Sequence, residues 1–389
     1  MRIVHLIDYF QAPLGYQESS LALSHQQAGH RVVVVTSDRY YPFAGYEKVY
    51  YRLLGPRIVG TGKRREQGIN VVRLPSWELP RTPVIFLRYL KQTLNSIRPE
   101  LVFCHGVYSA LSVMAALYKN SFRYRLVYDS HASGFNTDFN SHPFKKSYHF
   151  IFRLFSPLIF NRADKIFAVG ESEKEFLLND FNLPRHRVEI LRVGIDSRIY
   201  SFNPLSRLGI RKNLGIKESD TVLVFSGKIN PGKDLKVLLR ALNKISDPGF
   251  ILMIIGGGDS SYTGELKKMD ISPVRIIWLD FVNRNKLVSY FSAADLAVWP
   301  GDASIGMLQA LSCGLPLIIP EWFGSGYLKK QGIAVTFPRG NFQLLAEIIN
   351  KLSKNYDLRR KISEKAKNYI KNELSWKKIA EKSLILPKN

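Results

Sequence analysis

Two lysines on either side of a turn are the side chains best suited to bind an anion. Lys228 and Lys233 lie five positions apart, after the apolar run Thr221–Ser226 and just before a helical stretch that starts at Leu235. At the carboxyl end of a parallel strand, beside a helix N-terminus, such a pair is well placed to hold a diphosphate. An exposed loop with two solvated lysines would carry the same residues. A Walker phosphate loop does not fit, because its Gly-x-x-x-x-Gly-Lys-Ser/Thr order is absent.

A second group of polar residues follows another apolar run, which ends at Trp299. After a loop of small residues, Ile305–Ser312 is expected to form a helix whose first turn offers unpaired backbone N–H groups. Asp302, Ser304 and Gln309 are the polar side chains near the start of this helix. Backbone N–H groups and the lysines of the earlier loop could together bind one anionic ligand.

The elements that must position these residues alternate between strand and helix. At the N-terminus, the pattern predicts a strand Ile3–Ile7, a loop Asp8–Tyr16, a helix Gln17–Ala28 and a strand Arg31–Thr36, which is a β-α-β unit. Both strands are continuously apolar, as in a parallel sheet that is covered on both faces. We expect further strands at Val71–Leu74, Leu101–Cys104, Arg125–Tyr128 and Lys165–Val169, helices at Val84–Ile97, Ala110–Lys119 and Ser172–Asn179, and a long loop over Asp38–Asn70.

A second series of the same kind begins at Thr221. Its expected strands are Thr221–Ser226, Phe250–Ile255, Arg275–Leu279, Leu296–Trp299 and Leu315–Ile319, and its helices are Leu235–Lys244, Asn283–Ser292 and Ile305–Ser312. Two such series predict an α/β protein of two doubly wound, Rossmann-like domains, joined near Gly194–Asn213. Since ligands of these sheets bind at the carboxyl ends of strands, the site is expected in a cleft between the domains.

Composition narrows the class of protein and its compartment. With 46% hydrophobic and 12% aromatic residues, the 389-residue chain is globular and long enough for two domains. Its net charge of +24 divides evenly, +11 over residues 1–195 and +13 over the rest, so no basic arm indicates nucleic-acid binding. Cys104 and Cys313 predict two buried thiols in a reducing compartment. Because neither a signal peptide nor a membrane span is expected, we predict a cytoplasmic protein, and a peripheral location on the inner face of the cell membrane is an open alternative.

Several motifs together resemble family 4 of the retaining glycosyltransferases, the glycosyl transferases group 1. The family's usual forms are Gly-Arg-x4-Lys-Gly and, later, Glu-x7-Glu-Ala-Met-Ala-Cys-Gly-x-Pro. The matching segments span about residues 1–340: Gly15–Glu18, Ala28–Val32, Arg192–Asp196, Gly227–Lys233, Ile255–Asp259 and Ala310–Pro316. The resemblance implies the GT-B fold, with an acceptor-side domain over 1–195, a nucleotide-sugar domain over 196–372, and a C-terminal tail, 373–389, that packs back toward the first domain.

The resemblance also assigns roles to particular residues. Lys228 and Lys233 would contact the donor diphosphate, with Lys228 where arginine is more common, and Gly15 would let its loop approach the donor closely. His131, in Tyr128-Asp-Ser-His, matches a histidine beside the donor sugar, whereas a histidine satisfied within the core is the alternative. His105 is the lesser candidate.

Both carboxylates of the resembled family are absent from their expected places. Alignment on Ala310 puts Gln309 at the second glutamate and Gly301 at the first. Gln309 could still bond ribose hydroxyls, because its amide both donates and accepts. Asp302, adjacent to Gly301, is a tentative replacement that would act with His131.

The implied reaction requires stabilisation of a diphosphate leaving group. Lys228, Lys233 and the helix N-terminus at Ser304, Ile305 and Gly306 would supply it electrostatically. No Asp-x-Asp sequence occurs, so we predict metal-independent transfer without a cofactor, with the nucleotide sugar as substrate. No enzymic nucleophile is evident, and attack on the same face of the sugar is what the resemblance implies.

The acceptor is expected to be a glycan or a lipid-linked molecule. Two stretches, Arg81–Arg98 and Lys145–Phe160, combine aromatic or aliphatic residues with cations, and basic amphipathic helices can lie on an anionic membrane surface. Packing in the core is the alternative for both. Together they favour a role in the assembly of cell-surface polysaccharide, lipopolysaccharide or glycolipid.

Two other functions share these features. The missing glutamates would suit a catalytically weak or inactive, donor-binding subunit of a glycosyltransferase complex. A nucleotide-sugar epimerase has the same architecture, but its proton-transfer or elimination chemistry would require carboxylates and a histidine in the cleft. The Cys-Gly-x-Pro segment favours a transferase. The sequence does not specify the sugar, the nucleotide or the acceptor.

Overall fold

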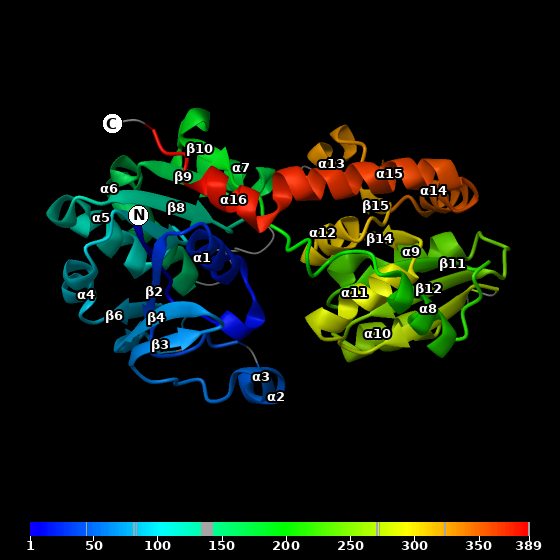
Figure 1. Cartoon of the computed structure of the whole chain (residues 1–389), viewed down its shortest axis with the longest axis horizontal. Coiled ribbons are helices and arrows are strands. Elements are labelled where there is room, and N and C mark those ends of the chain that lie inside the picture. The colour runs from blue at the N-terminus through cyan, green and yellow to red at the C-terminus, as the bar shows by residue number, and fades with distance from the viewer. Residues whose placement is uncertain are drawn as a thin grey trace. The chain divides into compact units, whose positions relative to one another are not determined.

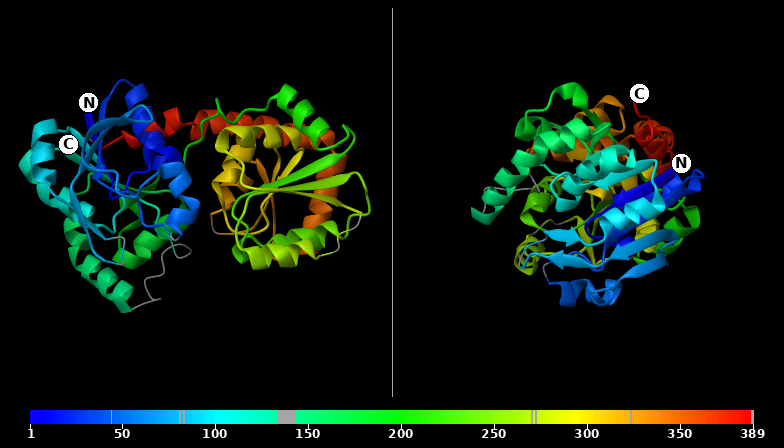
Figure 2. Two further views of the ribbon diagram at one scale, coloured as in Figure 1. Left: turned by 90° about the horizontal axis from the view of Figure 1, so that it is seen from below. Right: turned by 90° about the vertical axis from the view of Figure 1, so that its left-hand side faces the viewer.

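The computed structural model describes residues 1–43, 45–80, 82, 84–133, 143–269, 271, 273–322 and 324–387 (Figure 1). The chain forms two compact units. The first contains Met1–Gly194 together with Trp376–Asn389, and the second contains Ile195–Ser375. Each unit is built on a mainly parallel sheet with helices on both faces, which confirms the predicted fold class (Figure 2).

The first unit is built on a sheet of eight strands in the order β10-β9-β8-β7-β1-β2-β4-β3. All neighbours are parallel except β3 and β4. The strands are β1 (Arg2–Leu6), β2 (Arg31–Ser37), β3 (Gly62–Glu66), β4 (Ile69–Leu74), β7 (Leu101–His105), β8 (Arg125–Ser130), β9 (Lys165–Ala168) and β10 (Val188–Ile190). The helices are α1 (Gln17–Gln27), α2 (Tyr46–Val49), α3 (Tyr51–Leu54), α4 (Leu90–Ile97), α5 (Ala110–Phe122), α6 (Pro143–Arg162), α7 (Glu171–Phe181) and α16 (Trp376–Ser383).

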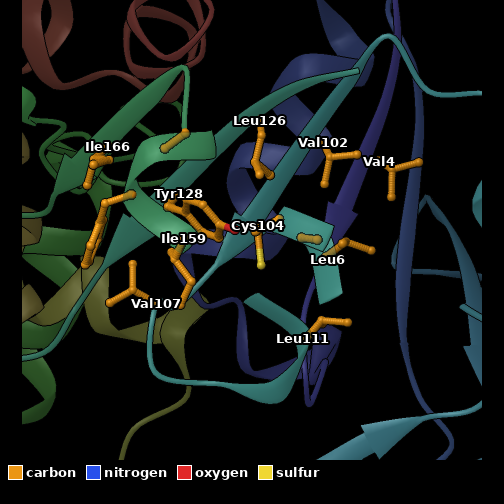
Figure 3. Packing of buried hydrophobic residues seen from close by; sticks show 14 of the residues in the cluster. Val4, Leu6, Val102, Cys104, Val107, Leu111, Leu126, Tyr128, Ile159 and Ile166 are labelled. Atoms are coloured by element: carbon orange, nitrogen blue, oxygen red, sulfur yellow. The ribbon is translucent and has the colours of Figure 1, made fainter. Parts of the chain in front are cut away.

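Apolar side chains from the inner strands and from α5, α6 and α7 fill the core on one face of this sheet. Strands β1, β7 and β8 each contribute alternate residues, because successive side chains of a strand point to opposite faces of the sheet. Figure 3 shows part of this cluster, including Val4, Leu6, Val102, Cys104, Leu111, Leu126, Tyr128, Ile159 and Ile166. Continuous burial of these strands explains why their sequences are apolar throughout.

Two expectations for this unit were wrong. The segment Asp38–Asn70 is not a long loop: it contains α2, α3 and the edge strand β3. Strand β3 is polar because it is largely solvent-exposed, and buried Arg73 of β4 joins it by an ion pair to Glu66 at 2.7 Å. The helix expected over Val84–Ile97 begins only at Leu90. Its first part is β6 (Ile85–Leu87), which pairs with β5 (Ser76–Glu78) in a two-stranded ribbon.

The second unit contains one parallel sheet in the order β13-β12-β11-β14-β15-β16. Its strands are β11 (Thr221–Ser226), β12 (Phe250–Ile255), β13 (Arg275–Leu279), β14 (Leu296–Val298), β15 (Leu317–Pro320) and β16 (Ala334–Phe337). Its helices are α8 (Pro204–Asn213), α9 (Leu235–Leu242), α10 (Ser260–Lys267), α11 (Arg284–Ala293), α12 (Ile305–Ser312), α13 (Gly326–Lys330), α14 (Phe342–Lys354) and α15 (Tyr356–Tyr369), followed by a π-helical turn, Ile370–Leu374. The order places β11 and β14 side by side at the centre, so the loops after them are neighbours.

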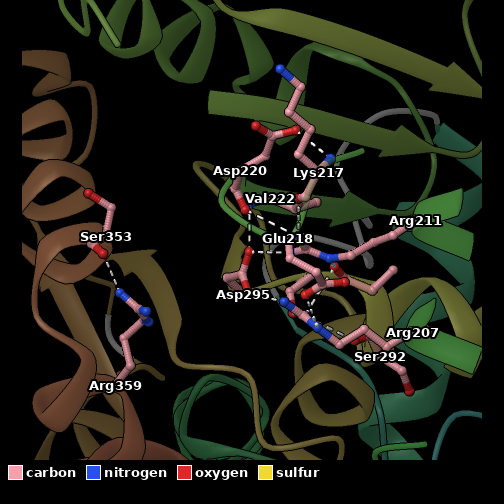
Figure 4. Close-up of polar contacts among 12 residues, drawn as sticks. Arg207, Arg211, Lys217, Glu218, Asp220, Val222, Ser292, Asp295, Ser353 and Arg359 are labelled. Carbon is pink, nitrogen blue, oxygen red and sulfur yellow. Dashed lines mark hydrogen bonds and ion pairs between the residues drawn. The ribbon is translucent and has the colours of Figure 1, made fainter. Parts of the chain in front are cut away.

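The segment Gly194–Asn213 is not a plain linker, because its second half forms α8. Figure 4 shows how α8 is anchored: Arg207 and Arg211 both point to Asp295. The Arg211 guanidinium is buried, lies 2.7 Å from the Asp295 carboxylate, and donates to the backbone carbonyls of Ala293 and Lys217. Such a buried pair is tolerated when its remaining donors are satisfied, as they are here. Helix α8 is therefore an integral part of the second unit.

The chain passes between the units at residues 194 and 195 and returns at 375 and 376. Ile195 donates a backbone hydrogen bond to the Leu374 carbonyl at 2.7 Å. Within the first unit, α16 packs against α1. Both cysteines are buried free thiols, and no helix in the described ranges is long and apolar enough to span a bilayer.

Candidate functional site

The loop after β11 holds the predicted lysine pair. Gly227 donates a backbone hydrogen bond to Ile255, the last residue of β12, and Ile229 donates to Gly257 just beyond it, so the loop runs beside this segment before it turns. A 3-10 turn, Pro231–Lys233, follows and leads through Asp234 into α9. Lys228 is exposed on this loop, whereas Lys233 is only partly exposed.

Lys233 is tied to the loop that follows β14. Its Nζ donates to the backbone carbonyls of Asp302 at 2.9 Å and of Ala303 at 2.8 Å. Burial lowers the pKa of Lys233, and the nearby Asp302 carboxylate opposes this shift. An ammonium group has three donors, so two carbonyls leave one for a further acceptor. The lysine thus joins two loops while keeping the means to bind an anion.

Asp302 is held by an arginine that the sequence reasoning missed. Arg339 Nη2 lies 3.1 Å from Asp302, and Arg339 Nε lies 2.9 Å from Asp234. Arg339 therefore adds a third cation beside the two predicted lysines. The signal in the sequence is its position two residues after the strand Ala334–Phe337, which is absent from the predicted elements.

The N-terminus of α12 lies against the end of β11. Ser304 caps the helix, its Oγ accepting from the Gly306 amide at 3.3 Å, and Ile305 is half exposed at the first helical position. At Gly306 a Cβ would lie 2.7 Å from Ser226 Oγ and 2.9 Å from the Trp299 ring. Only glycine therefore permits this close approach, and the partial positive charge of the helix N-terminus falls beside the lysine loop.

The two positions that carry glutamate in the resembled family differ in their surroundings. Gly301 is buried against the backbone of Gly232 and Lys233, with no room for a side chain. Gln309 is also buried, and its Nε2 donates to the Tyr200 hydroxyl at 2.9 Å. The amide predicted to meet ribose thus has a protein partner on its donor side. That prediction remains untested.

The predicted residues of the first unit lie at the carboxyl ends of its inner strands. Gly15 has a φ of 63° and closes the 3-10 turn Ala12–Leu14 by donating to the Ala12 carbonyl. This left-handed conformation explains the glycine. Glu18 follows in the first turn of α1, and burial raises its pKa, while the charge of His105 opposes the shift.

His131, just after β8, is paired with Asp129. Its Nε2 lies 3.9 Å from Asp129 Oδ2, and its side chain is 45% exposed. Partial burial opposes the charged imidazole, but the hydrogen bond to Asp129 and its charge outweigh this and raise the pKa of His131. Burial alone would raise the pKa of Asp129, yet His105 and then His131 hold it well below its usual value. His105 donates from Nδ1 to the same carboxylate at 2.8 Å.

The structure therefore brings the predicted residues together in two groups. Lys233, Asp302, Ser304 and Gly306 are neighbours in the second unit, with Gln309 further along the same helix. Gly15 and His131 belong to the first unit. Within the described ranges, no group of three or more His, Cys, Asp or Glu side chains is arranged to hold a metal ion. Transfer without a metal ion therefore stays a prediction.

The group in the second unit places cations around a helix N-terminus, an arrangement that is suited to an anionic ligand.

Comparisons with known proteins show the family and the fold of the chain. The family model described as glycosyl transferases group 1 matches residues 206–369, and the one described as glycosyltransferase family 4 matches residues 19–198. An uncharacterized glycosyltransferase of Methanocaldococcus jannaschii is 26% identical over 231 residues, which are 57% of this chain and 58% of that protein. The D-inositol 3-phosphate glycosyltransferase of Mycobacterium sp. (strain KMS) is 29% identical over 186 residues, 45% of this chain and 41% of the relative. The chain thus spans about half the length of these curated relatives.

Solved structures share the fold over nearly the full chain. HepE of Anabaena, crystallised in complex with UDP, has a TM-score of 0.72 at 16% identity and 98% coverage of both chains. WaaG, a glycosyltransferase involved in lipopolysaccharide biosynthesis, has a TM-score of 0.64 at 16% identity and full coverage of both. The two family models together account for most of both units, and this chain belongs to the glycosyl transferases group 1, or glycosyltransferase family 4, with the GT-B fold.

Proposed function

We propose that this chain is a retaining glycosyltransferase that moves a sugar from a nucleotide-diphosphate donor to a glycan or lipid-linked acceptor. The observation that carries the proposal is the position of Lys233, which joins the loop after β11 to the loop that leads into α12. A diphosphate beside Lys233 would receive its remaining N–H, the charge of Arg339 and the N–H groups of the helix N-terminus.

These groups would act on the leaving group. Negative charge accumulates on the diphosphate as its bond to the sugar breaks, and fixed donors in a partly buried site stabilise that charge more than water would. The acceptor hydroxyl would attack the same face of the sugar, and His131 with Asp129 would bond the sugar hydroxyls. We propose that this transfer needs neither a metal ion nor a cofactor.

The identity of the donor can be tested by a thermal-shift panel of UDP, GDP, ADP and CMP. A ligand that binds only the folded state at 100 times its Kd stabilises it by ~2.7 kcal/mol. We expect one nucleoside diphosphate to raise the Tm by several degrees, CMP to do less, and EDTA to leave the shift unchanged. If no nucleotide at millimolar concentration raises the Tm, the proposed donor class is wrong.

A second candidate function is a catalytically weak or inactive, donor-binding subunit of a glycosyltransferase complex. What favours it is the loss of both family glutamates, with Gly301 and Gln309 in their places. Transfer and donor hydrolysis, measured with a panel of nucleotide sugars, separate the two functions. Sugar transfer supports the enzyme, whereas tight nucleotide binding without turnover of any donor supports the subunit.

We propose that the first unit also contacts an anionic membrane surface through α6. Phe150, Ile151, Leu154 and Phe155 of this helix are exposed, and exposed Lys145 and Lys146 lie at its N-terminal end. The other candidate stretch, Arg81–Arg98, has Leu87, Leu90 and Leu94 in the core, and Arg81 lies outside the described residues. Among the two, α6 therefore fits the lipid-facing role. The structural neighbour WaaG is a glycosyltransferase involved in lipopolysaccharide biosynthesis, and we propose a related role for this chain.

Exposed apolar residues of α6 should contribute measurably to vesicle binding. The double substitution Phe150→Ser and Leu154→Ser is expected to reduce pelleting with phosphatidylglycerol-rich vesicles at low salt at least about tenfold, since burying each side chain contributes ~1.5–3 kcal/mol. Leu117→Ser, at an exposed position of α5, is the matched control. The membrane role is excluded if the unaltered protein does not pellet with these vesicles.

A further inference from the structure

Three histidine rings form a continuous hydrogen-bonded chain inside the first unit. His25 Nε2 lies 2.8 Å from Ser383 Oγ of α16, and His25 Nδ1 lies 3.0 Å from His5 Nε2. His5 Nδ1 lies 2.9 Å from His105 Nε2, and His105 Nδ1 lies 2.8 Å from Asp129 Oδ2. The chain thus connects the C-terminal helix with the carboxylate that faces the candidate site residue His131.

Sheet register explains why these rings meet. His5 of β1 is paired with Phe103 of β7, and His105 of β7 is paired with Asp129 of β8. Residues two apart share a face, so His5, His105 and Asp129 all point to one side of the sheet. Helix α1 covers that side and contributes His25. His5 and His25 are fully buried, so their ring nitrogens bond within the protein.

The hydrogen bonds of Ser383 in α16 determine the direction of every other hydrogen bond in the chain of histidines. The Ser383 hydroxyl donates its only proton to the Ala380 carbonyl at 2.8 Å, so Ser383 Oγ accepts from His25 Nε2. The Ala380 carbonyl, which can only accept, also faces His25. Burial lowers the pKa of His25 to about 3 and that of His5 well below its usual value, so both rings are neutral. A neutral ring donates from one nitrogen and accepts at the other.

Proton counting then gives the state of His105. With Nε2 of His25 protonated, its Nδ1 accepts from His5 Nε2, and His5 Nδ1 must therefore accept from His105 Nε2. At its other nitrogen, His105 faces the Asp129 carboxylate, which only accepts. Both nitrogens of His105 carry a proton.

We infer that His25 and His5 fix His105 as a buried imidazolium, and that this cation holds Asp129 ionised and oriented toward His131. His5, His25 and Ser383 are positioning residues that act on His131 through His105 and Asp129. The link to catalysis rests on the proposed function, whereas the protonation states do not. The chain also makes α16, far along the sequence from the other members, part of the support for this site.

The charges around His105 are consistent with a cation there. Asp129 faces it from β8 and Glu18 from the first turn of α1, whereas the neutral His5 faces it from β1. His131 shares the Asp129 carboxylate with His105, and Glu173 of α7 adds negative charge near His131. The ionised Asp129 carboxylate beside the imidazolium offsets the cost of burying it.

Replacing the acceptor of the chain should change the state of His105. In His5→Phe, His105 Nε2–H loses its acceptor, so His105 should become neutral with its proton on Nδ1. The charge of Asp129 would then act on His131 alone, and the pKa of His131 should rise further above its usual value. In His5→Gln, the amide again accepts from His105 and donates to His25. The protonation state of His105 and the pKa of His131 should therefore stay as in the unaltered protein.

Histidine side-chain NMR on the ligand-free protein tests this inference. Two-bond 1H–15N correlations distinguish the imidazolium from each neutral tautomer, and His105→Asn and His131→Asn assign the two resonances. At pH 7.5 we expect His105 to give the imidazolium pattern in the unaltered protein, in His5→Gln and in the exposed-site control His186→Gln, but not in His5→Phe. A neutral His105 in the unaltered protein overturns the inference, whether or not His5→Phe folds. Because no nucleotide sugar is added, this outcome is independent of nucleotide binding.

Discussion

Replacing Lys233 with alanine is expected to weaken the binding of the preferred nucleoside diphosphate at least about 100-fold. The substitution removes a charged donor to the diphosphate, a loss of ~1.5–3 kcal/mol, and it also leaves the carbonyls of Asp302 and Ala303 without their donor. The loop that leads into α12 then loses its tie to the loop after β11. A 100-fold change corresponds to ~2.7 kcal/mol, and titration calorimetry measures it directly.

Lys236→Ala is the matched control for this experiment. Lys236 lies three residues further on, in α9, and pairs with Glu265 at the surface, where an ion pair contributes little. The control removes the same charge from the same unit, so a change of less than about twofold is expected. If Lys233→Ala folds and binds the nucleotide as tightly as the control does, Lys233 does not hold the diphosphate.

The architecture could be predicted because buried parallel strands have continuous apolar sequences. Helix α1 extends over Gln17–Gln27, within one residue of the expected range, since Gly29 ends the pattern. Strand β3 could not be found in this way, because Gly62–Glu66 is polar and its stability comes from pairing with β4. Ile85–Leu87 has apolar residues that suit a helix equally well, and only the tertiary pairing with Ser76–Glu78 makes it a strand.

The candidate site was predictable only where its residues lie in local motifs. Lys233 and Ser304 follow strands in short, recognisable segments, and the central order of β11 and β14 brings them together. Arg339 comes from the edge strand of the same sheet, and no local motif marks it. His5 lies in an apolar strand and His25 among the polar residues of α1, so no local motif marks either of them, and sequence alone does not show that His5 has partners 20 and 100 positions away.

Restoring the family's glutamate at position 301 is expected to abolish donor binding, with a loss of affinity of about 1000-fold. A Cβ at Gly301 would lie 2.5 Å from the carbonyl carbon of Lys233 and closer still to the Gly232 carbonyl oxygen. These atoms belong to the backbone, so the loop after β11 must move to admit any side chain. Moving it displaces Lys233, and the combined cost of overpacking and lost phosphate contacts is ~4 kcal/mol.

Gly301→Ala separates crowding from charge, and Gln309→Glu serves as the control at the second family position. Alanine should lose most of the affinity that glutamate loses, because the first side-chain atom already meets backbone. Gln309→Glu is nearly isosteric and leaves the backbone of the loops unchanged, so less than about a tenfold change is expected. A gain of transfer activity in Gly301→Glu would show that the loop after β11 can move to admit the side chain. The site would then lack the glutamate without excluding it. Loss in both Gly301 variants would show that the backbone of Gly232 and Lys233 occupies the space of that carboxylate, so that any catalysis by this chain proceeds without it.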